Sequence, residues 1–247
     1  MCYDIAYFTK KIKKYEERFG VEYGGSEVIP MYHSSGFSHH PIPVVTNAAP
    51  QQLQQFIWGL IPFWVKDLAG AAKIQNRTLN ARDNTLLVKP SFRAAARKRR
   101  CLVLVDGFYD HHWHNGKSYP FYIKMRNDEP FALGGIWEAW TFGEEVRYTV
   151  AIVTTDPNET LEYIHNKPAK SDTPRMPFIV PADQEDQWLN IDLPDDDVQQ
   201  MILPFPDAPM AHYTVPRLRG KASPGNSPEI MQHTPYPELE DEQGTLF

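Results

Sequence analysis

Short apolar segments alternate with polar turns along most of the chain. Val, Ile, Tyr, Phe and Trp are frequent in these segments and Gly, Pro, Asn or Ser bound them, which is typical of β-strands. Asn115-Gly116, between two such segments, predicts a hairpin with a type I′ turn. The strands that we predict cover residues 28–32, 43–46, 56–64 (ending in a turn at Gly59 and Pro62), 101–105, 131–140, 146–155 and 176–181.

Helical patterns are few and short. Ile12, Tyr15 and Phe19 recur at helical spacing, which predicts a helix with Thr9 as its N-cap and Gly20 at its end. Ser91 is expected to cap a helix that runs toward residue 100. Two further short helices are predicted, one behind a capping box at 156–159 and one capped by Asp196 that ends at Ile202.

The balance of these elements predicts a single, strand-rich α+β domain. We expect a curved mixed or antiparallel sheet, or an open barrel, with short helices outside it. The domain is assigned to residues 1–235 and an acidic, flexible tail to 236–247. Cys2 and Cys101 are too few for a disulfide scaffold, and no N-terminal apolar run indicates a signal peptide or a membrane span. The prediction is a cytoplasmic monomer.

The net charge of −6 argues at first against a nucleic-acid partner. The acids are unevenly distributed, however, because residues 183–197 hold seven and residues 238–242 hold four, with no base in either stretch. Without these eleven, the chain has 20 acids against 25 bases. Phosphate binding is therefore not excluded.

The first two residues offer unusual chemistry. Removal of Met1 would give Cys2 both a thiol and a free α-amine, and an amine with a pKa of about 8 is partly neutral at neutral pH. Such a 1,2-aminothiol attacks an aldehyde to form a Schiff base and then a thiazolidine. The thiolate alone could instead act as an acyl-transfer nucleophile. A chance cysteine at position 2 is the simplest alternative.

Basic and aromatic residues form two candidate groups for nucleic-acid contacts. Trp64 could stack on an unpaired base or belong to the core, and Arg77 and Arg82 flank Asn80 in an ordinary-looking loop. Residues 89–100 hold six bases and no acid, as expected of a phosphate-binding helix or of a solvated surface helix. The histidines at 33, 39, 40, 112 and 114 match no zinc-binding pattern, so we expect neither a metal nor a cofactor. His165 reads as a helix-end residue.

Together these pieces resemble the SRAP family, the SOS-response-associated peptidase proteins that attach covalently to abasic sites in single-stranded DNA. The resemblance spans nearly the whole chain and is carried, in order, by Met1-Cys2, WGLIPFW (58–64), NAR (80–82), CLVLVDGFYD (101–110), IH (164–165), RMP (175–177) and VPR (215–217).

The resemblance implies a site made of Cys2, Asn80, Asp110 and His165. Cys2 would be the crosslinking nucleophile after autocatalytic removal of Met1, and Asn80 would orient the Cys2 amine or the sugar. Asp110 would help to open the deoxyribose ring, and His165 would transfer protons. We assign DNA contacts to Trp64, Arg77, Arg82, Arg175 and the four bases Arg97, Lys98, Arg99 and Arg100.

Three departures from the family pattern stand out. Tyr3 and Asp4 replace the usual Gly-Arg, so a phosphate-binding arginine is absent and a carboxylate repels DNA instead. Eight further residues, 167–174, lengthen the link between His165 and the RMP strand. Asp110 stands where the family has a glutamate. Two other functions stay open: a cysteine peptidase that uses Cys2 and His165, and a non-catalytic module that binds single-stranded nucleic acid.

Overall fold

A closed ring of five strands forms the centre of the molecule in a computed structural model, which describes residues 2–25, 28–168 and 173–239. The ring runs β11–β10–β7–β4–β5 through antiparallel pairs and closes by a parallel pairing of β5 with β11. Its strands are β4 (Pro41–Thr46), β5 (Ala49–Trp58), β7 (Arg100–Val105), β10 (Phe131–Phe142) and β11 (Glu145–Thr155). The α+β prediction is confirmed, and the barrel is closed rather than open.

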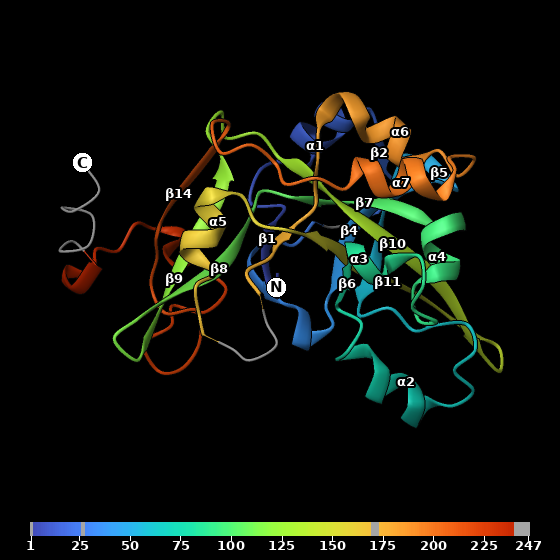
Figure 1. Ribbon diagram of the computed structural model, residues 1–247, viewed down its shortest axis with the longest axis horizontal. Coiled ribbons are helices and arrows are strands. Elements are labelled where there is room, and N and C mark those ends of the chain that lie inside the picture. Colours follow the sequence, from blue (N-terminus) through green and yellow to red (C-terminus); the bar gives the residue numbers. More distant parts are fainter. Residues whose placement is uncertain (1, 26–27, 169–172, 240–247) are drawn as a thin grey trace.

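A second, antiparallel sheet lies beside the barrel, on the left in Figure 1. The chain enters it directly from β7, because Asp106 donates its backbone N–H to the Ala6 carbonyl at 2.8 Å and β8 begins at Gly107. Asn115 and Gly116 both have positive φ, which confirms the hairpin turn between β8 and β9. In spatial order the strands are β14 (Met210–Thr214), β9 (Lys117–Met125), β8 (Gly107–His114), β1 (Asp4–Tyr7) and β3 (Met31–Ser35).

Short strands and helices cover the barrel. α1, α6 and α7 lie above it in Figure 1, α4 at one side and α2 below. The additional strands are β2 (Glu22–Tyr23), β6 (Asn80–Arg82), β12 (Met176–Pro177) and β13 (Ile179–Val180). The helices are α1 (Ile12–Phe19), α2 (Leu68–Gln75), α3 (Asp83–Leu86), α4 (Arg93–Lys98), α5 (Glu159–Ile164), α6 (Glu185–Leu189) and α7 (Asp195–Met201), with 3₁₀ turns at Gly36–Ser38, Ala182–Gln184 and Pro228–Met231.

The core explains the apolar pattern of β7. All six of its residues are buried because β10 and β4 flank it and helices cover its outer face, so the strand reads as a continuous apolar run. Cys101 lies in this strand, fully buried, and burial raises the pKa of its thiol. It is a core thiol.

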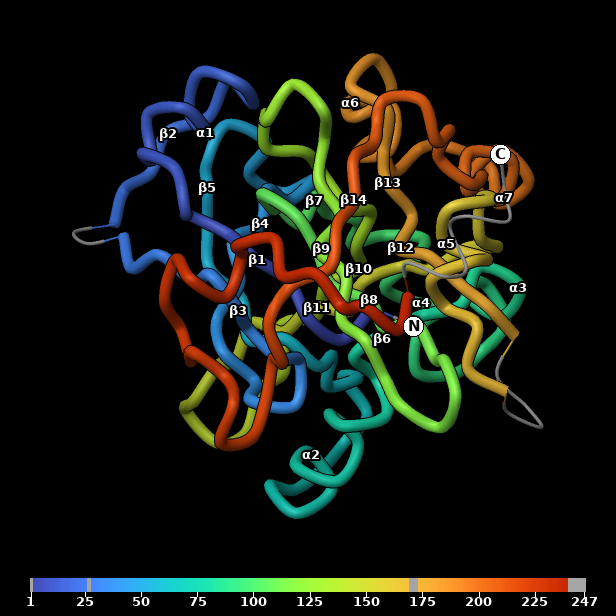
Figure 2. Tube along the Cα trace, turned by 90° about the vertical axis from the view of Figure 1, so that its left-hand side faces the viewer, coloured from blue at the N-terminus to red at the C-terminus, as the bar shows by residue number. Residues whose placement is uncertain are grey.

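The second sheet is also covered on its other face. Val215, Leu218 and Ile230 pack against Ala6 and Tyr109, so the segment after β14 lies across the sheet, as Figure 2 shows in orange and red. The packed part continues past the boundary expected after residue 235, since the Tyr236 hydroxyl donates to the Val215 carbonyl at 2.9 Å and Leu239 is buried. The rest of the predicted tail, 240–247, lies outside the described residues.

Several predicted helix starts are wrong. Thr9 does not cap α1; its backbone N–H and hydroxyl both donate to the buried Asp106 carboxylate. The helix behind Ser91 begins at Arg93, and α5 is capped by Asn158, whose side chain accepts from Leu161 N, rather than by Asp156. Asp196 lies in the first turn of α7 instead of before it. The sequence prediction also missed β1, β6, β14, α2, α3 and α6, and the strand predicted at 56–64 ends at Trp58 as part of β5.

Candidate active site

Cys2 lies two residues before the start of β1 and is fully buried. Its carbonyl accepts a 2.8 Å hydrogen bond from Nδ2 of Asn80, the first residue of β6. β6 is fixed by its parallel pairing with β11, which sets Asn80 opposite Ile152. The other amide atom, Asn80 Oδ1, is buried and has no hydrogen-bond partner among the described residues. The barrel thus presents an unused acceptor close to the Cys2 backbone.

The Cys2 thiol is held in its neutral form. Burial raises the pKa of this thiol well above its ordinary value, and the negative charges of Asp110 and Asp4 raise it further. Asp110 is therefore close enough to Cys2 to act on it electrostatically. This environment disfavours a thiolate as the first nucleophile.

Asp110 and His165 form a hydrogen-bonded pair beside Cys2. Asp110 Oδ2 lies 2.9 Å from His165 Nδ1, and Asp110 Oδ1 accepts a 2.8 Å bond from the His111 backbone N–H. Burial by itself raises the pKa of Asp110, but the hydrogen bond and charge of His165 together with the His111 bond lower it, and the net pKa is below its ordinary value of 3.8. Asp110 is therefore a carboxylate at neutral pH.

The end of α5 is docked onto β8, and this contact positions His165. His112 Nδ1 lies 2.9 Å from the Tyr163 carbonyl, and the two rings stack at 4.5 Å between centroids. One residue beyond His165, the Asn166 side chain accepts from Trp113 N at 2.6 Å and donates to Trp113 O at 3.0 Å. These contacts hold His165 against β8 despite the long link that follows, of which residues 169–172 lie outside the described part.

The Asp110–His165 pair opens into a cavity of about 350 Å³. Charged groups of both signs line it, since Asp4, Lys167 and Arg219 share its wall with the pair. An aromatic side is provided by Tyr3 and Phe37, whose rings lie 5.1 Å apart. The remaining wall consists of Tyr109, His111, Trp113 and Ser118.

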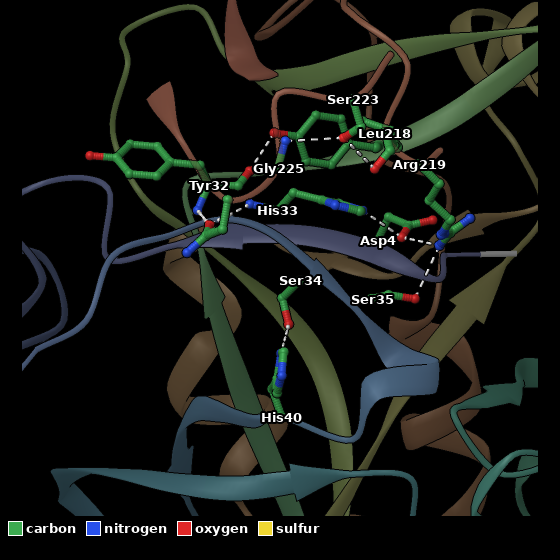
Figure 3. Close-up of polar contacts among 12 residues, drawn as sticks. Asp4, Tyr32, His33, Ser34, Ser35, His40, Leu218, Arg219, Ser223 and Gly225 are labelled. Atoms are coloured by element: carbon green, nitrogen blue, oxygen red, sulfur yellow. Dashed lines mark hydrogen bonds and ion pairs between the residues drawn. The ribbon is translucent and has the colours of Figure 1, made fainter. Parts of the chain in front are cut away.

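Asp4 is buried rather than directed at solvent (Figure 3). Its Oδ1 lies 2.8 Å from His33 Nε2 on β3 and also accepts from Nη2 of Arg219. Arg219 comes from the segment that follows β14 and donates to Ser35 Oγ at 3.0 Å as well. The carboxylate that the sequence predicted to repel DNA is thus paired with a cation inside the fold.

Some of the residues assigned to DNA contacts lie at the surface. Trp64 is 45% exposed, and with Arg77, Lys66 and Lys73 it lines a groove of about 430 Å³ between α2 and the loop after β5. Lys98 is exposed at the end of α4. Arg82 is half-buried on β6, two residues beyond Asn80.

The other assigned cations have partners within the protein. Arg97 binds Asp195 through both carboxylate oxygens, and Arg99 donates to Glu138 at 2.7 Å. Arg100 is fully buried and donates to the carbonyls of Ala96, Trp188 and Asn190. Arg175 is buried between Asp83 and Asp156 and donates to the Thr154 carbonyl at 2.7 Å. Neither Arg100 nor Arg175 offers a free surface to DNA, so their assignment to DNA contacts is wrong.

Sequence reasoning missed four residues around the site. His33 and Arg219 contact Asp4 from distant parts of the chain, so no local pattern could reveal them. Asn166 could have been identified because it directly follows His165. His112 was considered only as a metal ligand. In the described residues no group of three or more His, Cys, Asp or Glu side chains could hold a metal ion. No helix in this part of the chain has the length and apolar character needed to span a membrane.

The fold and site define a class of protein: an α+β barrel domain in which a cysteine at position 2 lies beside a carboxylate–histidine pair. The family model for SOS response associated peptidase (SRAP) matches residues 1–221, and the chain belongs to this family. The abasic site processing protein YoqW of Bacillus subtilis is 34% identical over 198 residues, 79% of this chain and 83% of that protein. The abasic site processing protein HMCES of Gallus gallus is 29% identical over 64% of this chain and 51% of that protein.

A solved structure from Bacteroides thetaiotaomicron has the same fold. It superposes with a TM-score of 0.85 at 32% identity and covers 95% of this chain and 100% of its own. A protein from Bordetella bronchiseptica, 20% identical with a TM-score of 0.73 over 87% of this chain, also shares the fold.

Proposed function

We propose that this protein recognises abasic sites in single-stranded DNA and attaches to them covalently through Cys2, after autocatalytic removal of Met1. One observation carries the proposal: Cys2, Asn80, Asp110 and His165 converge at one place, joined by the Asn80–Cys2 and Asp110–His165 hydrogen bonds. The relatives named abasic site processing proteins support the choice of DNA lesion. The adduct would shield the lesion.

The state of each group fits imine chemistry. The Asp110 carboxylate accepts the proton of the sugar C1′ hydroxyl while His165 gives a proton to the ring oxygen, and the ring opens to an aldehyde. The Cys2 amine then attacks this aldehyde and water leaves, which forms the Schiff base. The thiol adds to the imine carbon and its proton passes to the nitrogen, which closes the thiazolidine. Because the thiol acts last and as a neutral S–H, its raised pKa does not hinder the first step.

Asn80 has the atoms for a positioning role. Its Nδ2 donates to the Cys2 carbonyl, and its buried Oδ1 can accept a hydrogen bond from the Cys2 amine or from a sugar hydroxyl. Filling that acceptor removes the cost of a buried, unpaired oxygen, about 1–3 kcal/mol. Substrate binding is thereby coupled to the geometry of Cys2.

The proposed DNA surface extends from the cavity to exposed groups. Trp64 stacks on a base, and Arg77, Arg82 and Lys98 bind phosphates, which positions the strand without reading sequence. Arg97 and Arg99 join only if DNA displaces their carboxylate partners. We expect a monomer that acts in the cytoplasm and associates with the nucleoid when it is bound to DNA.

An adduct gel tests the function. An abasic single-stranded oligonucleotide should give a denaturation-resistant band with the processed protein. An uncleavable N-terminal extension should abolish the band, because an amide nitrogen cannot form an imine. Cys2→Ser should retain imine formation but yield a less durable adduct. Peptide cleavage without an adduct would favour a cysteine peptidase instead, and reversible, salt-sensitive binding alone would favour a non-catalytic module.

A further inference from the structure

A cation from the C-terminal part of the chain reaches the candidate cavity. Arg219 lines its wall together with Asp110, His165 and Lys167, although the chemistry proposed above gives it no role. Its side chain is 54% exposed, whereas the Asp4 carboxylate that it contacts is 5% exposed. The guanidinium therefore has one edge against the protein and the other toward the cavity.

The bonds of Arg219 use only one of its nitrogens. Nη2 donates to Asp4 Oδ1 and to Ser35 Oγ, contacts that are drawn in Figure 3. A guanidinium carries five N–H donors, so the Nε–H and both Nη1–H groups stay available. No described residue accepts from them. Asp4 and Ser35 thus fix the orientation of Arg219 while leaving most of its donors unused.

The charge balance around Asp4 supports binding of an anion. Asp4 Oδ1 also lies 2.8 Å from His33 Nε2, so Arg219 shares this carboxylate with a second side chain. Lys167 adds a second positive charge to the wall, with Nζ 4.9 Å from the centre of the Trp113 ring. Asp110 is already engaged by His165 and by the His111 amide.

We propose that Arg219 binds the backbone phosphate next to the abasic nucleotide and so sets the sugar over Asp110 and His165. The inference rests on the proposed function, and it assigns the phosphate contact to a residue far along the chain from Asp4, which occupies the position where a phosphate-binding arginine was expected. Guanidinium and phosphate match in geometry and form charge-assisted hydrogen bonds. Asp4 is a positioning residue for Arg219.

The test uses noncovalent binding so that it does not depend on crosslinking. The ligand is a single-stranded oligonucleotide with a tetrahydrofuran abasic analogue, which cannot open to an aldehyde. Arg219→Gln should weaken binding about tenfold, the loss of one charge-assisted bond. The slope of log K against log salt should become shallower by about 0.7, the value of one phosphate contact on a single strand. Arg126→Gln, which removes an exposed arginine beyond β9, is the control and should change neither.

A neutral linkage identifies the phosphate. The phosphates on either side of the lesion are replaced, one at a time, by an uncharged methylphosphonate, which should weaken binding by the unmodified protein. At one of the two positions, Arg219→Gln should then cause no further loss of affinity. Additive losses at both positions, or an unchanged salt slope, would show that Arg219 only ties the C-terminal segment to β1. Arg219→Lys is the control for misfolding. It keeps the positive charge, so the slope of log K against log salt should not change. A failed adduct gel with intact tetrahydrofuran binding would reject the crosslinking function and leave the phosphate contact standing.

Discussion

Asp110 owes its ionisation state to two opposing effects. Burial favours the neutral acid, while His165 and the His111 amide favour the carboxylate and prevail. Asp is also one methylene shorter than the glutamate of the family pattern, yet Asp110 Oδ2 lies within hydrogen-bond distance of His165. The docking of α5 onto β8 holds His165 within reach of this shorter side chain.

We predict that Asp110→Asn slows adduct formation on natural abasic DNA by at least about tenfold, because the amide cannot accept the C1′ hydroxyl proton. The loss should be much smaller on a substrate with a preformed aldehyde. Rates are measured by quenched gel assays. Asp128→Asn, which removes a surface carboxylate paired with Lys10 and Lys124, is the control. Equal rates for Asn and Asp at position 110 on natural abasic DNA would leave Asp110 a structural carboxylate.

The lowered pKa of Asp110 predicts a pH dependence of stability. A carboxyl group with a pKa that is lower in the folded state stabilises the fold above its unfolded value and loses this contribution as the pH falls through the folded value. The free energy of unfolding of the native protein should therefore exceed that of Asp110→Asn most clearly between about pH 5 and 7, and the difference should shrink below about pH 4. Urea titrations across this range measure it. If the difference in the free energy of unfolding did not change with pH, ionisation of Asp110 would make no contribution to stability.

At the scale of elements, the contact between α5 and β8 matters most for the site. Asn166→Ala removes both hydrogen bonds to Trp113 and should cost about 1 kcal/mol of stability. Adduct formation should slow by roughly fivefold, because a shift of His165 well below 1 Å costs less than the ~100-fold of a full 1 Å misplacement. Asn127→Ala, in a loop on the far side of β9, is the matched control. An unchanged rate with lowered stability would show that Asn166 does not position His165.

The basic residues in and after helix α4 differ in their surroundings. Arg100 follows it in sequence but belongs to the core, where it connects α4 to the C-terminal end of α6 through three carbonyls. Arg100→Gln should therefore lower the free energy of unfolding by about 3 kcal/mol, since buried carbonyls lose charged donors. Chemical denaturation measures this change. Where the variant is folded, the salt dependence of its DNA binding should equal that of the unmodified protein. A shallower salt slope for the folded variant would show that Arg100 does contact DNA.

In the molecule as a whole, packing in the wall of the closed barrel should affect the stability of the protein but not the rate of adduct formation. Its wall is tight at Gly135, where an added Cβ would lie 2.8 Å from Cys101 Sγ and 3.0 Å from Val103 Cγ2. Gly135→Ala should destabilise the protein by about 1–3 kcal/mol through overpacking. Gly24→Ala, where nothing lies within 4 Å, should be nearly neutral. Thermal unfolding measures both, and adduct rates well below the transition should match those of the unmodified protein.

Local patterns in the sequence were sufficient for the hairpin and for the central strands β7, β10 and β11, but not for the bounds of β5 or for the short strands. The apolar run of β7 and the turn at Asn115-Gly116 depend on neighbouring residues, and both appear in the structure as predicted. Helix starts were less predictable because a capping side chain can be drawn to a distant partner, as Thr9 is to Asp106. Isolated short helices have little stability of their own, so packing decides where they begin.

Residue patterns were enough to predict the α+β class and the chemistry available at Cys2, and the family resemblance implied the roles of Asn80, Asp110 and His165. The pairing of Asp4, the burial of Arg100 and Arg175 and the position of Arg219 at the cavity became visible in the folded molecule. These contacts join residues that lie far apart along the chain, so no local pattern contains them. A charge is repulsive, structural or available to a ligand according to its partner, and here the partners come from segments that the closed barrel and the second sheet bring together.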